Sequence, residues 1–217
     1  FSIPFVGLND EGIPQIINEK GEVATTDINF QEYEKLGFLK YEGPTEPTTT
    51  GGLNNTLTWK NWRLNVFVTY SFGNKLRLDP VFSYAYSDMD AMPKEFKNRW
   101  VQPGDEATTD IPAIASYRQA TKINHLSYAY NAYNYSSARI ADGGFIRLKD
   151  ISLTYDLPRN TINRIGLSTA SLKLDVTNIC LLYSDKKLNG QDPEFVNSGG
   201  VASPMPKQFT LTLRLGM

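Results

Sequence analysis

The sequence has little of the residues on which most catalytic and metal sites depend. Its 217 residues include one cysteine, Cys180, and one histidine, His125. One cysteine excludes an internal disulfide, and these two residues cannot supply a zinc site built from Cys and His ligands. A lone histidine also leaves little room for triad chemistry. We therefore expect no catalytic residue, no metal site and no cofactor, and we expect the chain not to be an enzyme.

An excess of charge of one sign and a long apolar run are also missing. Lys and Arg total 22 against 23 Asp and Glu, so electrostatics gives no reason to expect a nucleic-acid partner. The longest apolar run, 179–183, is far too short for a membrane-spanning helix. Aromatic residues are plentiful instead, with 12 Tyr, 11 Phe and 3 Trp beside 16 Gly and 12 Pro. This mixture favours strands and loops over helices.

Alternation of apolar and polar residues is the strongest pattern in the chain. It runs through 53–60 and 62–72, on either side of a two-residue turn at Lys60 and Asn61. It returns in 150–157, 171–177 and 208–217, and it slips near 147–150, where we expect a β-bulge. Several of these segments reach about ten residues, the length that a tilted strand needs to cross hydrocarbon. The pattern predicts long antiparallel strands.

The alternation also divides each strand into two faces. Charged residues occupy the polar rows, and an Arg or Lys facing lipid would cost about 2–4 kcal/mol. We therefore predict that the polar rows face water or a polar lumen, with candidate residues Arg63, Asn65, Lys173, Asp175 and Arg214. Aromatic residues near the strand ends are typical of girdles at a membrane interface. The candidates for that role are Trp59, Trp62, Tyr70, Phe72 and Tyr155.

Long and short connections alternate along the chain, as they do in outer-membrane barrels. We predict external loops at about 18–52, 73–144 and 183–207, and periplasmic turns at about 60–61 and 158–168. Short extended pieces are expected within 3–8 and 13–18, and a strand at 81–86. Short helices are expected at 27–35 and 93–100, and a helical turn at 159–165. Residues 43–52 are expected to be irregular.

Four loop tyrosines form a tract that the pattern predicts to be exposed: Tyr128, Tyr130, Tyr133 and Tyr135. They are candidates to contact a sugar ring or a peptide, although packing between loops is the commoner role for such residues. His125 is expected to be an ordinary loop histidine, and Cys180 a buried or lipid-adjacent thiol.

Acidic pairs in the loops could be offered as general acids and bases. Asp88 with Asp90, Asp105 with Glu106 and Asp192 with Glu194 all lie in Gly/Pro-rich stretches, where solvated carboxylates are the expectation. An all-β hydrolase would instead need two carboxylates on strands, from among Asp150, Asp156 and Asp175. A soluble secreted β-sandwich that binds carbohydrate through exposed aromatics also fits the alternation. Strand length and the alternating loop sizes favour the barrel interpretation.

A series of short motifs occurs in a fixed order along nearly the whole chain. It includes Thr50-Gly-Gly-Leu53, Thr58-Trp-Lys-Asn61, Tyr70 to Lys75, Asn98-Arg-Trp100 and Pro103-Gly-Asp-Glu106 with Ile111-Pro112. It continues with Gly144 to Tyr155, Leu157-Pro158, Val176-Thr-Asn178, Gly190 with Asp192-Pro-Glu194, and Pro206 to Leu211. Taken together, these motifs resemble the C-terminal part of the barrel in the SusC/RagA family of TonB-linked outer-membrane transporters.

The resemblance implies an all-β fold, an antiparallel transmembrane β-barrel segment that supplies the last five to seven strands of a roughly 22-stranded barrel. It implies import of large nutrients, glycans or peptides, across the outer membrane of a Gram-negative, Bacteroidetes-type bacterium. The implied partners are the remainder of the barrel and its plug domain, outer-membrane lipid, a SusD-like surface lipoprotein and the TonB complex. The plug is absent from this sequence, and because the chain starts at Phe1 we expect it to be a piece of a longer protein.

Overall fold

The computed structural model describes residues 1–32, 34–163, 166–196 and 205–217. The chain forms two compact units. Unit 1 comprises Phe1–Thr45 and Lys75–Ala141, and unit 2 comprises Glu46–Asn74 and Asp142–Met217. Among the described residues, the helices are all too short or too polar to cross a membrane.

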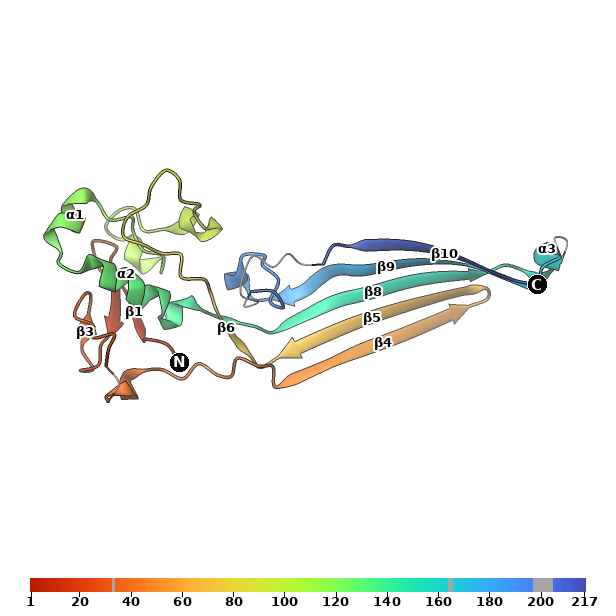
Figure 1. Ribbon diagram of the computed structural model, residues 1–217, viewed down its shortest axis with the longest axis horizontal. Coiled ribbons are helices and arrows are strands. Elements are labelled where there is room, and N and C mark those ends of the chain that lie inside the picture. The colour runs from red at the N-terminus through yellow and green to blue at the C-terminus, as the bar shows by residue number, and fades with distance from the viewer. Residues whose placement is uncertain (33, 164–165, 197–204) are drawn as a thin grey trace. The chain divides into compact units, whose positions relative to one another are not determined.

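Unit 2 contains one five-stranded antiparallel sheet (Figure 1). Its strands are β4 (Thr49–Trp59), β5 (Trp62–Phe72), β8 (Phe145–Asp156), β9 (Thr169–Ser184) and β10 (Gln208–Gly216). They lie in the order β10-β9-β8-β5-β4. The long strands predicted in 53–60, 62–72, 150–157, 171–177 and 208–217 are therefore all present, and the all-β segment implied by the resemblance is confirmed with five long strands.

The hairpin between β4 and β5 turns through Lys60 and Asn61, as predicted. Lys60 adopts a left-handed conformation with φ 53°, and the Asn61 side-chain amide donates a 2.8 Å hydrogen bond to the Asp156 carbonyl. β4 begins at Thr49, earlier than the sequence pattern indicates, so the irregular region predicted at 43–52 is wrong for its last four residues. The pattern misses this start because Gly51 and Gly52 have no side chain to alternate.

These two glycines make room for aromatic rings on both faces of the sheet. A Cβ at Gly51 would collide with the Tyr70 hydroxyl, and a Cβ at Gly52 would lie 2.8 Å from the Phe67 ring. Glycines in strands often mark such close approaches. Packing of an aromatic ring over a glycine compensates for the side chain that the strand lacks.

Bulges interrupt the pairing of β8 with its neighbours, as predicted from the slip in alternation. The register shifts between Leu148 and Asp150 against both β5 and β9. On β9 the bulge contains Asn178, whose φ of 53° is left-handed. Asn tolerates this conformation better than most residues. The connection after β8 contains α3 (Arg159–Ile162), so the predicted helical turn at 159–165 is confirmed to Ile162, and residues 164 and 165 lie outside the described residues.

Unit 1 is built from short elements. A sheet of β1 (Phe5–Leu8), β2 (Pro14–Ile17) and β3 (Val23–Ala24) confirms the predicted extended pieces. β6 (Lys75–Arg77) pairs with β7 (Ile140–Asp142). The helices are α1 (Tyr117–Lys122) and α2 (Leu126–Asn134), with 3-10 turns η1 (Leu36–Phe38), η2 (Lys94–Asn98), η3 (Asp105–Ala107) and η4 (Ser137–Arg139). η2 falls within the predicted helix at 93–100.

The core of unit 1 gathers around α2. Leu126, Ala129 and Tyr130 pack with Ile13, and Tyr133 packs with Phe82 and Phe96. Nearby, a buried ion pair joins Arg139 and Glu95 at 2.7 Å. The predicted external loop at 73–144 thus includes part of a folded lobe with its own core.

Two short elements predicted in unit 1 are wrong. No strand forms at 81–86, because Phe82 is buried and its backbone N–H and C=O bond the side chain of Asn134 at 3.1 and 2.7 Å. No helix forms in the described part of 27–35, which excludes residue 33. Asp27, the expected cap, pairs with Lys20 at 2.9 Å instead, and the Asn29 side chain accepts from the Gln31 N–H in a competing local turn.

Candidate functional site

The sheet of unit 2 has one face made almost entirely of apolar side chains, here called the apolar face. Its middle row is five leucines in direct cross-strand register: Leu57, Leu64, Leu153, Leu174 and Leu211. A neighbouring row contains Trp59, Trp62, Tyr155, Leu172 and Leu213, and the other neighbouring row Val66, Ile151, Val176 and Phe209 with Asn55. The described part of unit 2 contains no second sheet that covers these rows.

The apolar face is exposed. Leu57 is 62% accessible, Leu211 68% and Phe209 73%. A soluble monomer rarely exposes a continuous apolar patch of more than a few hundred Å², and each such side chain left in water forgoes about 1.5–3 kcal/mol. This face therefore requires an apolar surrounding.

Aromatic rings stand near both ends of the apolar face. Near the Lys60–Asn61 turn, the rings of Trp62 and Tyr155 lie 4.5 Å apart, and Trp59 pairs with Trp62 across the hairpin. At the other end, the rings of Tyr70 and Phe72 stack at 5.9 Å, and Tyr183 lies 6.4 Å from Phe72. The five residues predicted for girdles are thus brought to two levels of one face, and Tyr183 is an addition that the sequence reasoning missed.

The opposite face, here called the polar face, contains all five residues predicted to line a lumen. Arg63 and Lys173 share one cross-strand row with Thr154, and Asn65 and Asp175 share the next with Ser152. Arg214 lies opposite Ser171, which pairs with Asp156. Ion pairs link Arg63 to Asp156 at 3.5 Å and Lys173 to Asp175 at 3.1 Å. Whether this face borders a lumen stays a prediction.

A buried ion cluster lies toward the other end of the polar face. Arg147 pairs with Thr69 in the β5–β8 register, and its guanidinium contacts Asp192 at 2.5 Å and Glu194 at 2.8 Å. The side chains of Arg147 and Asp192 are 9% and 7% exposed, whereas that of Glu194, at the edge of the cluster, is 42% exposed. The expectation of solvated loop carboxylates is therefore wrong for Asp192, because a buried guanidinium compensates its charge. Asp192 and Arg147 were not predicted as partners, since 45 residues separate them in sequence.

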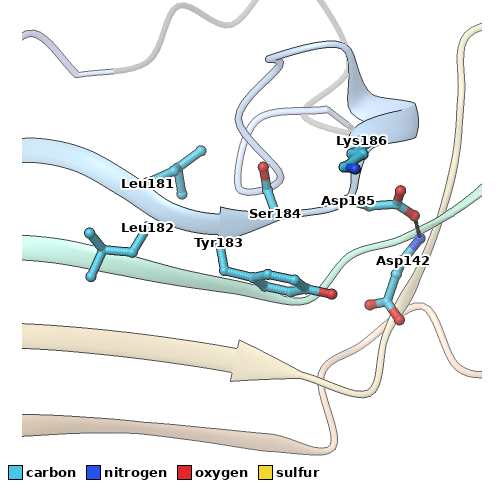
Figure 2. A pocket seen from close by; sticks show the side chains of 7 residues that line it. All are labelled: Asp142, Leu181, Leu182, Tyr183, Ser184, Asp185 and Lys186. Atoms are coloured by element: carbon cyan, nitrogen blue, oxygen red, sulfur yellow. Dashed lines mark hydrogen bonds between the residues drawn. The ribbon is translucent and has the colours of Figure 1, made fainter.

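Two hollows open at the ends of the long strands. One, of about 600 Å³, is lined by Asp142 and residues 181–186. Figure 2 shows Leu181 and Ser184 on one side of the strand end and Tyr183 on the other, with the Asp142 N–H donating to Asp185 at 2.7 Å. The second hollow, of about 320 Å³, is lined by Asp156, Arg159 and Arg214 among others. In the described residues, no group of His, Cys, Asp and Glu is arranged to hold a metal ion.

The tyrosine tract is not uniformly exposed. Tyr130 and Tyr133 are each 1% exposed, so the prediction that they are available for contact is wrong. They lie on α2, where Leu126, Ala129, Tyr130 and Tyr133 follow helical spacing and face the core. This spacing is the signal that could have revealed them. Tyr128 and Tyr135 are exposed, and Tyr128 packs edge-on against Phe30 at 5.5 Å.

Burial also changes the acidity of these residues. It raises the pKa of the Tyr130 and Tyr133 hydroxyls, and the Tyr130 hydroxyl donates to the Ala113 carbonyl at 2.6 Å. Elsewhere in unit 1 the Trp100 indole donates to Glu106 at 2.9 Å. That bond, with backbone N–H groups, holds the pKa of Glu106 below its usual value. These interactions stabilise the fold of the unit.

Comparison with known proteins gives consistent results. No family model matches the chain. It is 27% identical over 178 residues to TonB-dependent receptor P3 of Formosa agariphila, and 29% identical over 184 residues to TonB-dependent receptor P26 of the same organism. These matches cover 82% and 78% of this chain but 15% and 17% of the two receptors. The chain therefore spans about a sixth of the length of these curated relatives.

Solved structures support the same fold. The structure of the RagAB peptide importer in the closed-closed state aligns with 99% of this chain and 22% of that chain, with a TM-score of 0.68 and 21% identity. The open-open state aligns with 100% of this chain, with a TM-score of 0.66 and 20% identity. Sequence and fold thus confirm the predicted resemblance: the chain is SusC/RagA-like, and it matches a part of a TonB-dependent receptor.

Proposed function

We propose that this chain forms part of the wall of an outer-membrane active transporter that imports large nutrients, either glycans or peptides. In this proposal the apolar face of the sheet contacts lipid and the polar face borders the lumen. The remainder of the barrel and a plug domain complete the transporter. A SusD-like lipoprotein closes it from outside, and the TonB complex supplies energy.

The observation that carries this proposal is the exposed apolar face with aromatic rings at two levels. β5 has 11 residues, so Trp62 and Phe72 are ten steps apart. Ten steps span about 33 Å along a strand. At the usual tilt of 35–45° they rise about 25 Å, the height of the apolar band in outer-membrane barrels.

The relatives support the remaining parts of the proposal. Receptors named TonB-dependent are the reason to expect TonB coupling. The resemblance to the SusC/RagA family favours a SusD-like lipoprotein partner and an outer-membrane location in a Bacteroidetes-type bacterium. Because the RagAB structures are those of a peptide importer, peptides are the first substrate class to test, with glycans the other.

The competing proposals have less support. A carbohydrate-binding β-sandwich needs a second sheet over the apolar face, and the described part of unit 2 contains one sheet. For the hydrolase, Asp150 and Asp175 lie in adjacent rows of the polar face, but Asp175 pairs with Lys173, and neither residue lines the two hollows described above. We therefore propose a transport role without enzymatic activity.

Thiol labelling on two adjacent positions tests the membrane orientation of the sheet. Thr210 and Leu211 are neighbours on β10 that lie on opposite faces. Each is changed to Cys in a Cys180→Ser background and the protein is recovered in outer membranes. We expect Leu211→Cys to react only with a lipid-soluble maleimide and Thr210→Cys with a charged one. Recovery as a soluble monomer, or equal labelling of both positions by the charged reagent, would overturn the proposal.

The substrate class needs a separate experiment. A strain that lacks the transporter is grown with peptides or with individual glycans as the limiting nutrient. Loss of growth on one class alone, restored by the intact gene, assigns the substrate. Growth on every source equal to the parent strain would contradict the import role.

A further inference from the structure

The segment that follows β9 is attached to the rest of unit 2 at two points, through two of its own aspartate side chains. At its start, Asp185 accepts from the Asp142 N–H at 2.7 Å and from the Lys187 N–H at 2.9 Å. Further along, Asp192 contacts the Arg147 guanidinium through both carboxylate oxygens, at 2.5 and 2.7 Å. The described segment 185–196 is therefore fixed at its start by a hydrogen bond to a backbone N–H and further along by the buried ion cluster.

The side of the sheet on which this segment lies follows from the register of β5. Pairing between β4 and β5 is regular from Thr49 to Trp59, so residues 63, 65, 67, 69 and 71 share the polar face. Arg147 is opposite Thr69 and thus projects from the same face. Because the Arg147 guanidinium binds Asp192 and Glu194, residues 192–194 are held over the polar face.

The ion cluster is built to hold the segment firmly. Arg147 is buried against Phe145, with its guanidinium carbon 5.4 Å from the ring centroid. Asp192 also organises its own turn, since its carboxylate accepts from the Glu194 N–H at 3.1 Å and its carbonyl from the Phe195 N–H at 2.9 Å. Removing one partner of a buried ion pair leaves the other charge uncompensated. The position of segment 185–196 over the polar face, here called its seated position, thus depends on Arg147.

We propose that Arg147, Asp192 and Glu194 form a latch that holds segment 185–196 over the polar face, where it narrows the opening of the lumen at that end of the sheet. The inference rests on the proposed function, because it assigns the polar face to a lumen. It makes Arg147 a positioning residue that limits access to the lumen. Opening the latch widens the entrance on the side of this sheet.

The first experiment measures release of the segment. Leu188 is 1% exposed, so a Leu188→Cys thiol in a Cys180→Ser background is shielded while the segment is seated. We expect Arg147→Met to raise the rate of labelling by a charged maleimide at least about tenfold, and Arg147→Lys to give an intermediate rate. The matched control is Arg63→Met, which removes an arginine from the same face but breaks only an exposed ion pair at 3.5 Å.

The second experiment measures the width of the opening. Thr69→Cys places a thiol on the polar face opposite Arg147. It is labelled with a small and with a polymer-linked charged maleimide, in the receptor as it occurs in outer membranes. With the latch intact we expect the large reagent to react much more slowly than the small one. Arg147→Met should raise the large-reagent rate more than the small-reagent rate.

The outcomes separate this inference from the proposed function. Unchanged labelling of Leu188→Cys in Arg147→Met overturns the latch, and an unchanged ratio of the two reagents at Thr69→Cys overturns the narrowing. If Arg147→Met does not assemble, Asp192→Asn is measured by the same criteria. Failure of the proposed function would appear instead as loss of the protein from outer membranes, or as equal labelling of Thr210→Cys and Leu211→Cys.

Discussion

The two units of this protein place their large apolar side chains in opposite ways. In unit 1, Tyr130 and Tyr133 are 1% exposed and pack inside a shell of short elements. In unit 2, Leu211 is 68% exposed, on a face that no other sheet of the described residues covers. Apolar burial stabilises a fold only relative to water. Unit 1 therefore buries its large apolar side chains in its own core, whereas unit 2 leaves them on an open face, which the proposed function places against lipid.

Truncating the core of unit 1 should have the largest effect on this contrast. Tyr133→Ala removes a buried ring that contacts Phe82 and Phe96, and we expect it to destabilise unit 1 by about 3–5 kcal/mol. Protease sensitivity of the unit in increasing urea measures this loss. Tyr133→Phe keeps the ring and should retain most of the stability. The sheet of unit 2 should stay folded in Tyr133→Ala, as measured by the heat-dependent mobility of the barrel on a gel. Loss of that folded form together with unit 1 would show that the sheet depends on unit 1.

A charge on the apolar face should have the next largest effect. Leu174→Arg places a guanidinium in the leucine row and should cost about 2–4 kcal/mol if that row faces lipid. The yield of heat-resistant barrel in outer membranes measures it. Thr210→Arg is the matched control, since residue 210 lies opposite Asp175 on the polar face. Equal tolerance of both substitutions would mean that the two faces meet the same solvent.

The bulge at Asn178 should be sensitive to side-chain shape rather than polarity. Its φ of 53° costs an ordinary L-residue about 1–2 kcal/mol, and more for a β-branched one. We expect Asn178→Val to lower barrel stability by at least that amount and Asn178→Gly to be neutral or better. Midpoints of urea unfolding in lipid vesicles compare the two. A Val variant as stable as the Gly variant would contradict the role of the bulge conformation.

The smallest expected effect is an acid sensitivity confined to unit 1. The Trp100 indole, with backbone N–H groups, holds the pKa of Glu106 below its usual 4.5 in the folded state. This interaction therefore stabilises fully above pH 4.5 and is lost as pH falls through the lowered folded pKa. Trp100 fluorescence should change in that acid range and Glu106→Gln should abolish the change. A transition that persists in Glu106→Gln would assign it to another group.

The sheet was predictable because alternation is a local property of the sequence. The five strands, the Lys60–Asn61 turn and the bulge in β8 all follow from residues close together in the chain. The division into two faces follows from the same alternation, because a one-residue shift would invert it. The start of β4 was not predicted because Gly51 and Gly52 have no side chains, so they do not show the alternation of apolar and polar residues.

Unit 1 and the ion cluster were less predictable because they depend on distant residues. Phe82 appears in an alternating stretch, yet Asn134, 52 residues away, binds its backbone. Asp192 appears solvated in its loop until Arg147 is brought beside it. The helix α2 could have been predicted, since Leu126, Ala129, Tyr130 and Tyr133 have helical spacing. Its tyrosines instead suggested an exposed surface that contacts a ligand.

The outer strands of the sheet have a consequence for how such a chain reaches its destination. β4 and β10 are the two edges of the sheet in the part of the chain that the structure describes. β4 has 11 residues and β10 has 9, and each strand presents backbone N–H and C=O groups along its outer edge. Unpaired edges of this length recruit other strands, including copies of themselves. In the proposed setting the segment therefore has to be shielded from aggregation in the periplasm until adjoining strands and lipid accept it together.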